Sequence, residues 1–330
     1  MDPVTHAAVA RMTVSVAPGP VSRIGALLPI LGGLAPDVDA VFMPLGWDIY
    51  LRVHEAGTHS AAGGLLLAVL VAALFRWRTA SAFGPLVGAA TIAVFSHIAL
   101  DALSGATIRP GWPFASYRTS IGLVGMADPW FVAPVAVALA VSLARGCGLV
   151  RVAPHTLAIL GLLLLGKFVS RAAATDIYEA SRAVDPVERY VQPQWGSLTG
   201  WWVYERTADR LRTWRVDAVQ GTAVLRLEVD VPSARLLDEE GGRLSTVRNF
   251  LSAHDLPVRV AVSDGQGRTV YWSDLRFCWR ATAGPDPSTA TTERPSSEPV
   301  ACRVWFGGRI DAAGSVGREF VTIGDYVQER

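Results

Sequence analysis

Four long stretches of the sequence contain no aspartate, glutamate, lysine or arginine. They cover residues 56–75, 79–100, 129–144 and 152–166. A helix that crosses the hydrocarbon core of a bilayer needs about 17–25 largely apolar residues, and a fifth stretch, 24–42, is apolar apart from two aspartates. The pattern therefore predicts a polytopic α-helical membrane domain with about five spans, at residues 24–42, 60–77, 83–103, 129–145 and 153–170. The alternative is a buried helical core in a soluble protein.

The composition supports a membrane protein. Charged residues make up 18% of the 330 residues and hydrophobic residues 51%. Soluble domains have about 25% charged residues, so the composition disfavours an ordinary cytosolic enzyme and a disordered chain. The formal net charge of +1 provides no general attraction for nucleic acid. We therefore expect membrane lipid, and no nucleic acid, among the partners of the chain.

Three pairs of arginines indicate how the predicted spans are oriented. The pairs are Arg11 and Arg23 before the first span, Arg76 and Arg78 after the second, and Arg145 and Arg151 between the fourth and fifth. With five spans, all three pairs lie on one face of the membrane, and basic loops are enriched on the cytoplasmic face. We expect a multi-pass protein of the inner (plasma) membrane without a cleavable signal peptide. Its N-terminus would be cytoplasmic and its C-terminal domain extracytoplasmic.

After residue 174 the hydrophobic pattern changes from long apolar runs to alternation. Apolar and charged residues alternate over 225–231, which is typical of a half-buried strand. Residues 258–262 and 269–272 flank a glycine-containing turn and predict a β-hairpin; 201–204 and 214–219 are further candidate strands. We therefore divide the chain into a membrane-embedded helical domain (1–174) and a soluble, mostly antiparallel β domain (175–330). The Pro-, Ser- and Thr-rich stretch 284–299 is expected to be a flexible loop within the β domain.

Two cysteines lie in short aromatic segments on either side of that loop. We expect the segments around Cys278 and Cys302 to pair as neighbouring antiparallel strands, which brings the cysteines within reach of a disulfide. Such a bond suits an extracytoplasmic domain; the alternative is two reduced core cysteines. Cys147 lies beside the arginines of the predicted cytoplasmic face and is expected to remain a free thiol.

Ionisable residues occur in and beside the predicted spans, where they are costly and usually line functional cavities. His97 and Asp101 are four residues apart and therefore lie on one face of a helix. This spacing lets both side chains bind one metal ion, or lets the carboxylate orient the imidazole. Further candidates in the N-terminal part are His6, Asp37, Asp39, His54 and His59. The same residue types could form a proton relay.

Several short motifs follow one another in a particular order. They are T-H at 5–6, A-P-D-V-D at 35–39, H-E-A-G-T-H-S at 54–60, S-H-I-A-L-D at 96–101, P-F at 113–114 followed by Arg118, and D-P at 128–129. In this order they resemble the membrane-bound metal-dependent hydrolases, also described as LexA-binding, inner-membrane-associated hydrolases. The resemblance covers residues 1–145. Glu55 replaces an arginine that is usual in the family, and Ala40 stands where many members have histidine.

The resemblance implies a divalent-metal centre. Its ligands would come from His6, Asp37, Asp39, His54, His59, His97 and Asp101. Imidazole and carboxylate ligands suit zinc or manganese, and seven candidates exceed one tetrahedral site, so two ions are an alternative to one. The general base would be Asp128 or a non-ligating aspartate of the 37/39 pair, although Asp128 also fits a helix N-cap before Pro129. Arg118 would hold a phosphate or carboxylate, or would be an interfacial residue whose charged end reaches the water.

These features predict a membrane-bound hydrolase that uses a metal-activated water on an ester or phosphoester, such as a lipid or envelope component. The alternative is a non-enzymatic membrane protein. It would be a metal- or proton-coupled transporter, or an assembly factor whose β domain binds a protein partner. A hydrolase site is expected at one membrane face, whereas a transporter needs polar residues across the bilayer.

Overall fold

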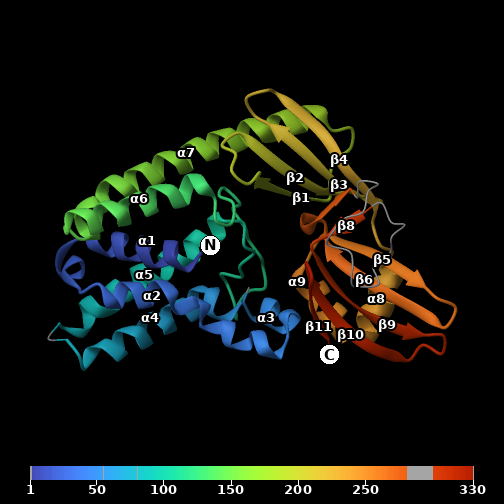
Figure 1. The fold of residues 1–330 in the computed structure, drawn as a ribbon, viewed down its shortest axis with the longest axis horizontal. Helices are drawn as coiled ribbons and strands as arrows, with labels where there is room; N and C mark the ends of the chain where they lie inside the picture. The colour runs from blue at the N-terminus through green and yellow to red at the C-terminus, as the bar shows by residue number, and fades with distance from the viewer. Residues whose placement is uncertain (1, 55, 80, 281–299, 330) are drawn as a thin grey trace. The chain divides into compact units, whose positions relative to one another are not determined.

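The computed structural model describes residues 2–54, 56–79, 81–280 and 300–329 (Figure 1). The chain forms two compact units, each built from several segments. The first unit contains Met1–Val41, Val53–Thr175 and Gln192–Trp201; the second contains Phe42–Arg52, Asp176–Val191 and Trp202–Arg330. The predicted flexible loop, 284–299, and Glu55 lie outside the described residues.

The first unit is helical. Its helices are α1 (Pro3–Val16), α2 (Leu27–Leu34), α4 (Ala61–Arg76), α5 (Phe83–Leu103), α6 (Pro129–Arg145) and α7 (Leu149–Ser181), with the 3-10 segments η1 (Gly19–Arg23), η2 (Ala35–Leu45) and η3 (Gly57–His59). No helix was expected before residue 24. Asp2 nevertheless starts α1 there, because its side chain accepts a hydrogen bond from the Thr5 backbone N–H (2.9 Å).

Among the described residues, three helical segments are long and apolar enough to cross a membrane. They are Leu27–Leu45, Phe83–Leu103 and Leu149–Ser181. Helices α4 and α6 are apolar but have only 16 and 17 residues, so they are about 24–26 Å long at 1.5 Å per residue. The predicted helical N-terminal part is therefore confirmed, with three candidate membrane spans among the described residues; the count of five is not confirmed.

The first predicted span, 24–42, is not one continuous α-helix. Helix α2 ends at Leu34, and the chain continues as the 3-10 helix η2. Pro36 has no backbone N–H and cannot bond the carbonyl of Gly32, which favours the change in winding. The change occurs directly before Asp37 and Asp39, two of the predicted ligands.

Small residues let α1, α2 and α5 approach closely at the level of the predicted metal site. A Cβ atom on Gly33 of α2 would lie 2.5 Å from the Ala10 Cβ and 3.0 Å from the His6 carbonyl oxygen of α1. A Cβ on Gly32 would lie 2.8 Å from the Cβ of Ala93 on α5. Only glycine at these positions permits this packing.

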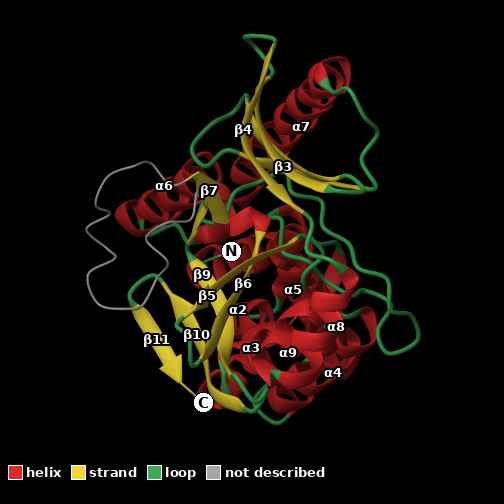
Figure 2. Cartoon of the chain, turned by 90° about the vertical axis from the view of Figure 1, so that its right-hand side faces the viewer, coloured by secondary structure: helices red, strands yellow, loops and turns green. Residues whose placement is uncertain are grey.

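The second unit is mostly antiparallel β structure, as predicted. Its strands, in chain order, are β1 (Glu188–Pro193), β2 (Gly200–Arg206), β3 (Arg210–Asp217), β4 (Thr222–Asp230), β5 (Pro257–Ser263), β6 (Gly267–Asp274), β7 (Cys278–Arg280), β8 (Val300–Cys302), β9 (Val304–Asp311), β10 (Val316–Ile323) and β11 (Tyr326–Glu329). They form a four-stranded sheet, β1-β2-β3-β4, a five-stranded sheet, β11-β10-β9-β6-β5, and the pair β7-β8 (Figure 2). The predicted hairpin is confirmed as β5 and β6.

Three helices in this unit were not predicted. They are α3 (Trp47–His54), α8 (Ala234–Arg243) and α9 (Ser245–Ala253). The segment that carries most of α3 joins the unit through two hydrogen bonds. The Trp47 N–H donates to Gln328 Oε1 (3.0 Å), and the Asn249 side chain donates to Asp48 (2.6 Å).

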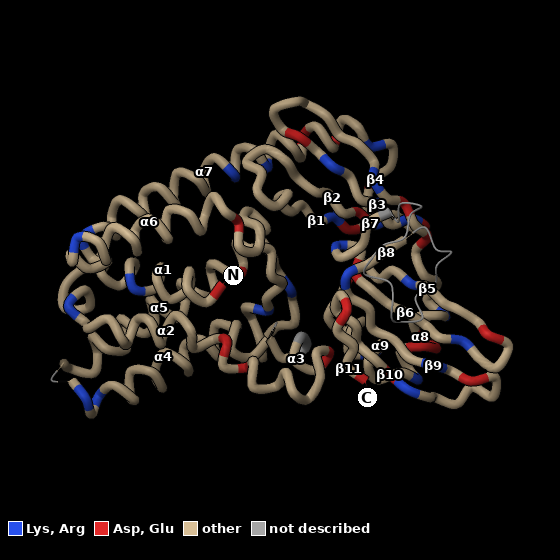
Figure 3. The backbone as a smooth tube through the Cα atoms, viewed as in Figure 1, with Lys and Arg blue, Asp and Glu red and all other residues tan. Residues whose placement is uncertain are grey.

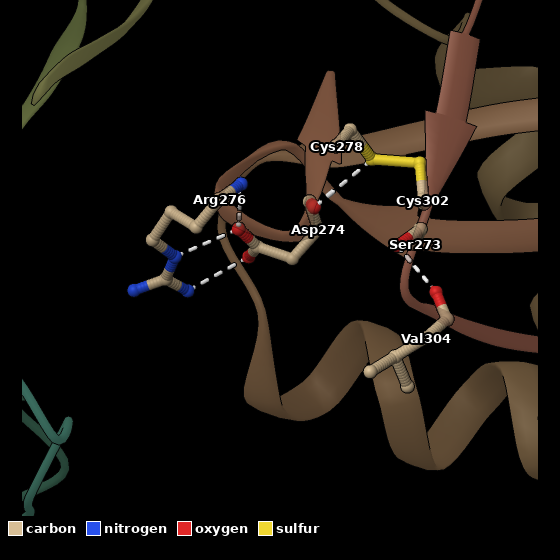
Figure 4. The surroundings of a disulfide bond; sticks show 6 residues. All are labelled: Ser273, Asp274, Arg276, Cys278, Cys302 and Val304. Carbon is tan, nitrogen blue, oxygen red and sulfur yellow. Dashed lines mark hydrogen bonds and ion pairs between the residues drawn. A yellow bond between two sulfur atoms is a disulfide. The ribbon is translucent and has the colours of Figure 1, made fainter. Parts of the chain in front are cut away.

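The predicted disulfide is confirmed. Cys278 and Cys302 are directly opposite in the β7–β8 pair and are bonded (Figure 4). Next to this bond, Arg276 forms two hydrogen bonds (both 2.7 Å) with the buried carboxylate of Asp274. Cys147 is a free thiol, as predicted.

Candidate metal centre

The structure brings all seven predicted ligands into one cluster in the first unit. The residues come from the start of α1 (His6), from η2 (Asp37, Asp39), from the segment around η3 (His54, His59) and from the last two turns of α5 (His97, Asp101). Five of them are almost completely buried; the side chains of Asp37 and His54 are 34% and 23% exposed. Asp37 and His54 are therefore the members of the cluster that face solvent.

Three ligand atoms at the centre of the cluster have the spacing of a metal site. The Nε2 atoms of His59 and His97 are 3.3 Å apart, and Asp101 Oδ2 lies 3.2 Å and 3.0 Å from them. Zinc bonds of about 2.0–2.1 Å in a tetrahedron separate the ligand atoms by about 3.3 Å. The observed separations therefore match those of three ligands around one ion.

A fourth atom lies on the open side of this group. Asp37 Oδ1 is 3.5 Å from His97 Nε2 and 4.0 Å from His59 Nε2. The longer distances and the exposed side chain distinguish Asp37 from the three buried ligands. It can complete the tetrahedron, or it can lie beside a water molecule that occupies the fourth position.

Hydrogen bonds aim the Nε2 atoms of both central histidines at the same point. His97 Nδ1 lies 2.7 Å from the Gly33 carbonyl oxygen, and because a carbonyl only accepts, Nδ1 carries the proton. The Thr58 hydroxyl donates to Asp39 Oδ2 (2.7 Å), so its oxygen is left to accept from His59 Nδ1 (3.1 Å). Both neutral imidazoles therefore present the Nε2 lone pair to the cluster centre, as metal-binding histidines do.

The remaining predicted ligands support the central group from outside. His6 Nε2 lies 3.2 Å from Asp101 Oδ1, and its ring stacks on the ring of His97 with the centroids 3.8 Å apart. His54 Nδ1 lies 3.1 Å from both carboxylate oxygens of Asp39.

Asp39, His54 and His59 also form a second group that could hold an ion. In that group His59 would have to use Nδ1, and a neutral imidazole has only one lone pair to offer. The central group is therefore the better site for a single ion.

The electrostatic environment favours a positive charge in the cluster. Burial alone would lower the pKa of His59, but the carboxylates of Asp101 and Asp39 raise that pKa above its usual value. The surrounding carboxylates therefore stabilise a cation, which can be a proton or a metal ion.

Asp128, a predicted general base, is not part of the cluster. Its Oδ1 accepts a hydrogen bond from the Trp130 N–H (3.0 Å), which confirms the N-cap interpretation for α6. Its Oδ2 accepts from Lys167 Nζ (2.8 Å), the only lysine of the chain, which also donates to the Ser197 carbonyl (2.7 Å). The buried ion pair occupies the carboxylate that the prediction assigned to proton transfer.

Sequence reasoning missed the Gly33 carbonyl, the Thr58 hydroxyl and the Lys167 partner of Asp128. Thr58 lies inside the H-E-A-G-T-H-S motif, which could have indicated its role. A backbone carbonyl leaves no signal in the sequence.

Comparison with known proteins supports the inner-membrane part of the resemblance. Residues 1–174 match the family described as YdjM inner membrane protein. No curated protein and no solved structure matches the chain. The matched segment covers more than half of the chain and contains all seven clustered residues. The chain therefore belongs to the YdjM inner membrane protein family.

Proposed function

We propose that the protein is a membrane-bound, metal-dependent hydrolase in which His59, His97 and Asp101 hold one divalent ion. The observation that carries the proposal is the triangle of their ligand atoms, with sides of 3.0, 3.2 and 3.3 Å. Two imidazoles and one carboxylate, with a further position open, are the donor set of catalytic zinc sites. Manganese accepts the same donors. Structural zinc sites, by contrast, are closed by four protein ligands.

When bound, such an ion lowers the pKa of a coordinated water to about 7 and so supplies a nucleophile at neutral pH. Asp37, the partly exposed carboxylate on the open side, would serve as general base and accept a proton from the attacking water. As the ester bond breaks, Asp37 would return that proton to the departing alcohol. Asp37 replaces Asp128 in this role because Asp128 is bonded to Lys167.

The other clustered residues keep the ligands in place. Thr58 and Asp39 orient His59, the Gly33 carbonyl orients His97, and His6 holds the second oxygen of Asp101. Such outer partners typically contribute 10–100-fold to metal affinity.

The helix ends indicate which membrane face the site occupies. Arginines gather where α1, α4 and α6 end: Arg23 closes the 3-10 segment after α1, Arg76 and Arg78 lie at the end of α4, and Arg145 and Arg151 lie at the end of α6 and the start of α7. The metal ligands lie at the opposite helix ends: the start of α1, the region after α2, the region before α4 and the end of α5. Figure 3 shows blue segments at the turns on the left of the helical unit and red segments toward its other end.

Because basic loops remain in the cytoplasm, the metal site faces the extracytoplasmic side. His6, at the start of α1, is 3.2 Å from Asp101, so the N-terminus belongs to this side as well, in contrast to the cytoplasmic N-terminus predicted from five spans. A disulfide in the C-terminal unit suits the same compartment.

Labelling of introduced cysteines tests this orientation in intact cells of a Cys147→Ser background. Trp77 follows α4 and is 93% exposed, and Phe114 follows α5 and is 90% exposed. A membrane-impermeant maleimide should label Phe114→Cys directly and Trp77→Cys only after permeabilisation. The reverse pattern would place the site in the cytoplasm.

Metal analysis of the detergent-purified protein tests the hydrolase proposal. We expect one ion per wild-type chain and almost none in His97→Ala. His155→Ala is the matched control, because His155 lies on α7 outside the cluster and is exposed. Removal of the ion should abolish hydrolysis of at least one substrate in a panel of esters and phosphoesters, and readdition should restore it. Full metal content in His97→Ala would refute the site, and metal binding without any hydrolysis would favour a non-enzymatic role.

A further inference from the structure

A long groove runs between α6 and α7, which lie side by side in the first unit (Figure 1). Its volume is about 580 Å³, and its walls are residues 130–141 of α6 and 152–163 of α7. The lining is apolar except for His155 and Thr156, and the Thr156 hydroxyl is bonded to the Val152 carbonyl (3.0 Å). Size and lining are typical of a site for a small apolar ligand between helices.

The length and surroundings of the groove match one lipid acyl chain. Each wall advances by 11 residues, which is roughly 16 Å at 1.5 Å per residue, and the hydrocarbon of one leaflet is about 15 Å thick. Helix α7 is a candidate membrane span, yet only 17% of its most apolar window is buried. Val137 and Ile159 of the two walls are 61% and 48% exposed. In a bilayer, lipid chains cover such a surface.

One end of the groove is polar. A second hollow of about 390 Å³ continues the groove past Ile159 and Leu163, which line both, and reaches Lys167. Trp130 lies at the same end of α6, two residues after the Lys167 partner Asp128, and is 47% exposed. Tryptophan is enriched where a membrane meets water. The polar end therefore lies at the depth at which lipid acyl chains join their headgroups.

Lys167 has one N–H to offer to a ligand in this hollow. An ammonium group has three donors; two are bonded to Asp128 Oδ2 (2.8 Å) and the Ser197 carbonyl (2.7 Å). In the part of the chain that the structure describes, the third has no hydrogen-bond acceptor, and the Trp201 ring is 6.0 Å from Nζ, at the limit of a cation–π contact. The side chain is only 4% exposed. An unpaired buried donor is costly, so an acceptor on a ligand would stabilise it.

The charge of this pair selects a neutral acceptor. Asp128 already balances the charge of Lys167, so an anionic ligand would add an uncompensated charge beside the hydrocarbon region, which is unfavourable. An ester carbonyl accepts a hydrogen bond without adding charge. In ester-linked lipids this carbonyl is the first group of the acyl chain, at the junction with the headgroup.

We propose that the groove between α6 and α7 binds one acyl chain of an ester-linked membrane lipid, and that Lys167 donates a hydrogen bond to the ester carbonyl of that chain. The groove shares no residue with the metal centre. The inference therefore goes beyond the proposed function and does not rest on it.

Filling the groove tests its location. Gly166 lines the second hollow and Gly161 lines neither, and a Cβ on either residue of α7 would meet no atom within 4 Å. Native mass spectrometry of the delipidated full chain measures the affinity for the first bound dioleoyl phosphatidylcholine. Gly166→Leu displaces part of the acyl chain and should bind about tenfold more weakly than wild type. Gly161→Leu is the matched control and should bind as wild type; equal affinities of the two variants would overturn the site.

An ether-linked analogue, which lacks the carbonyl, tests the hydrogen bond. Wild type should bind the diester lipid about tenfold more tightly than the diether lipid. Lys167→Met/Asp128→Asn removes the donor and its counter-charge together, and asparagine can still cap α6. This variant should bind both lipids with the affinity of wild type for the diether lipid.

Three results would overturn the recognition of the ester. They are equal affinities of wild type for the two lipids, a preference for the diester lipid that persists in Lys167→Met/Asp128→Asn, and tighter binding of oleate than of the diester lipid. Oleate has the same chain with a carboxylate at its end, so its preference would show that the polar end selects an anion.

Discussion

Replacement of Gly33 by alanine tests whether the close contact of α1 and α2 positions the metal ligands. The new Cβ would lie 2.5 Å from the Ala10 Cβ, whereas carbon atoms in ordinary contact are about 3.5–4.0 Å apart. The helices must therefore separate by about 1 Å. Because the Gly33 carbonyl accepts the hydrogen bond from His97 Nδ1 (2.7 Å), a displacement of α2 by this amount would disturb the orientation of that ligand.

The size of the effect follows from the cost of overpacking. Extra atoms in a packed core typically cost 1–3 kcal/mol, which lowers the melting temperature by roughly 2–4 °C per kcal/mol in a unit of this size. The matched control is Gly161→Ala on α7, because no atom lies within 4 Å of the new Cβ and alanine favours a helix. Thermal unfolding followed by tryptophan fluorescence and chelator competition for the metal would measure both effects. If Gly33→Ala melts and binds metal like Gly161→Ala, the contact does not position the ligands.

Three further predictions concern individual contacts. Thr58→Val should weaken metal binding about tenfold because it breaks the hydrogen-bonded link between Asp39 and His59, whereas Thr58→Ser keeps the hydroxyl and should bind metal like wild type. Metal affinity is measured by chelator competition. Equal affinities of the two variants would contradict the role of the Thr58 hydroxyl. Thiol labelling of the denatured, non-reduced protein should detect one free thiol, and Cys302→Ser should destabilise the C-terminal unit by about 3 kcal/mol in denaturant unfolding; three free thiols would refute the bond. Burial alone would raise the pKa of Glu319, but hydrogen bonds from Thr246 (2.6 Å) and Ser245 (3.1 Å) at the start of α9 lower that pKa. The Glu319 carboxylate should therefore stabilise the fold at pH values above the glutamate pKa of the unfolded chain, and this stabilisation should be lost as the pH falls through the lower pKa of the folded state. Glu319→Gln should thus lower the free energy of unfolding at pH 7 but not in strong acid. A loss of stability that is the same at every pH would contradict the lowered pKa.

Local patterns in the sequence predicted the parts of the fold that depend on near neighbours. The i, i+4 spacing of His97 and Asp101 needs only one helix, and the N-cap at Asp128 needs only the next residues of the chain. The hairpin of β5 and β6 likewise follows from alternation around a tight turn.

Features that depend on contacts between distant parts of the chain could not be predicted from local patterns. The approach of His6 to Asp101 requires that α1 pack beside α5, and only the family resemblance indicated it. Lys167 reaches Asp128 across 39 positions of the sequence. Pro36 did carry a local signal for the end of α2, but the apolar composition of 24–42 outweighed it in the prediction of a continuous span. Helices α8 and α9 were missed because both are short and α8 contains two glycines.

Two imidazoles and a carboxylate of this chain are proposed to hold one metal ion. X-ray absorption at the zinc edge of the purified, zinc-loaded protein tests it most directly. We predict nitrogen and oxygen neighbours of the zinc at about 2.0–2.1 Å. Scattering from the outer atoms of the imidazole rings should correspond to two imidazole ligands in wild type and in His155→Ala, and to one in His59→Ala. A wild-type spectrum without imidazole scattering, or with sulfur neighbours, would contradict the proposed ligands.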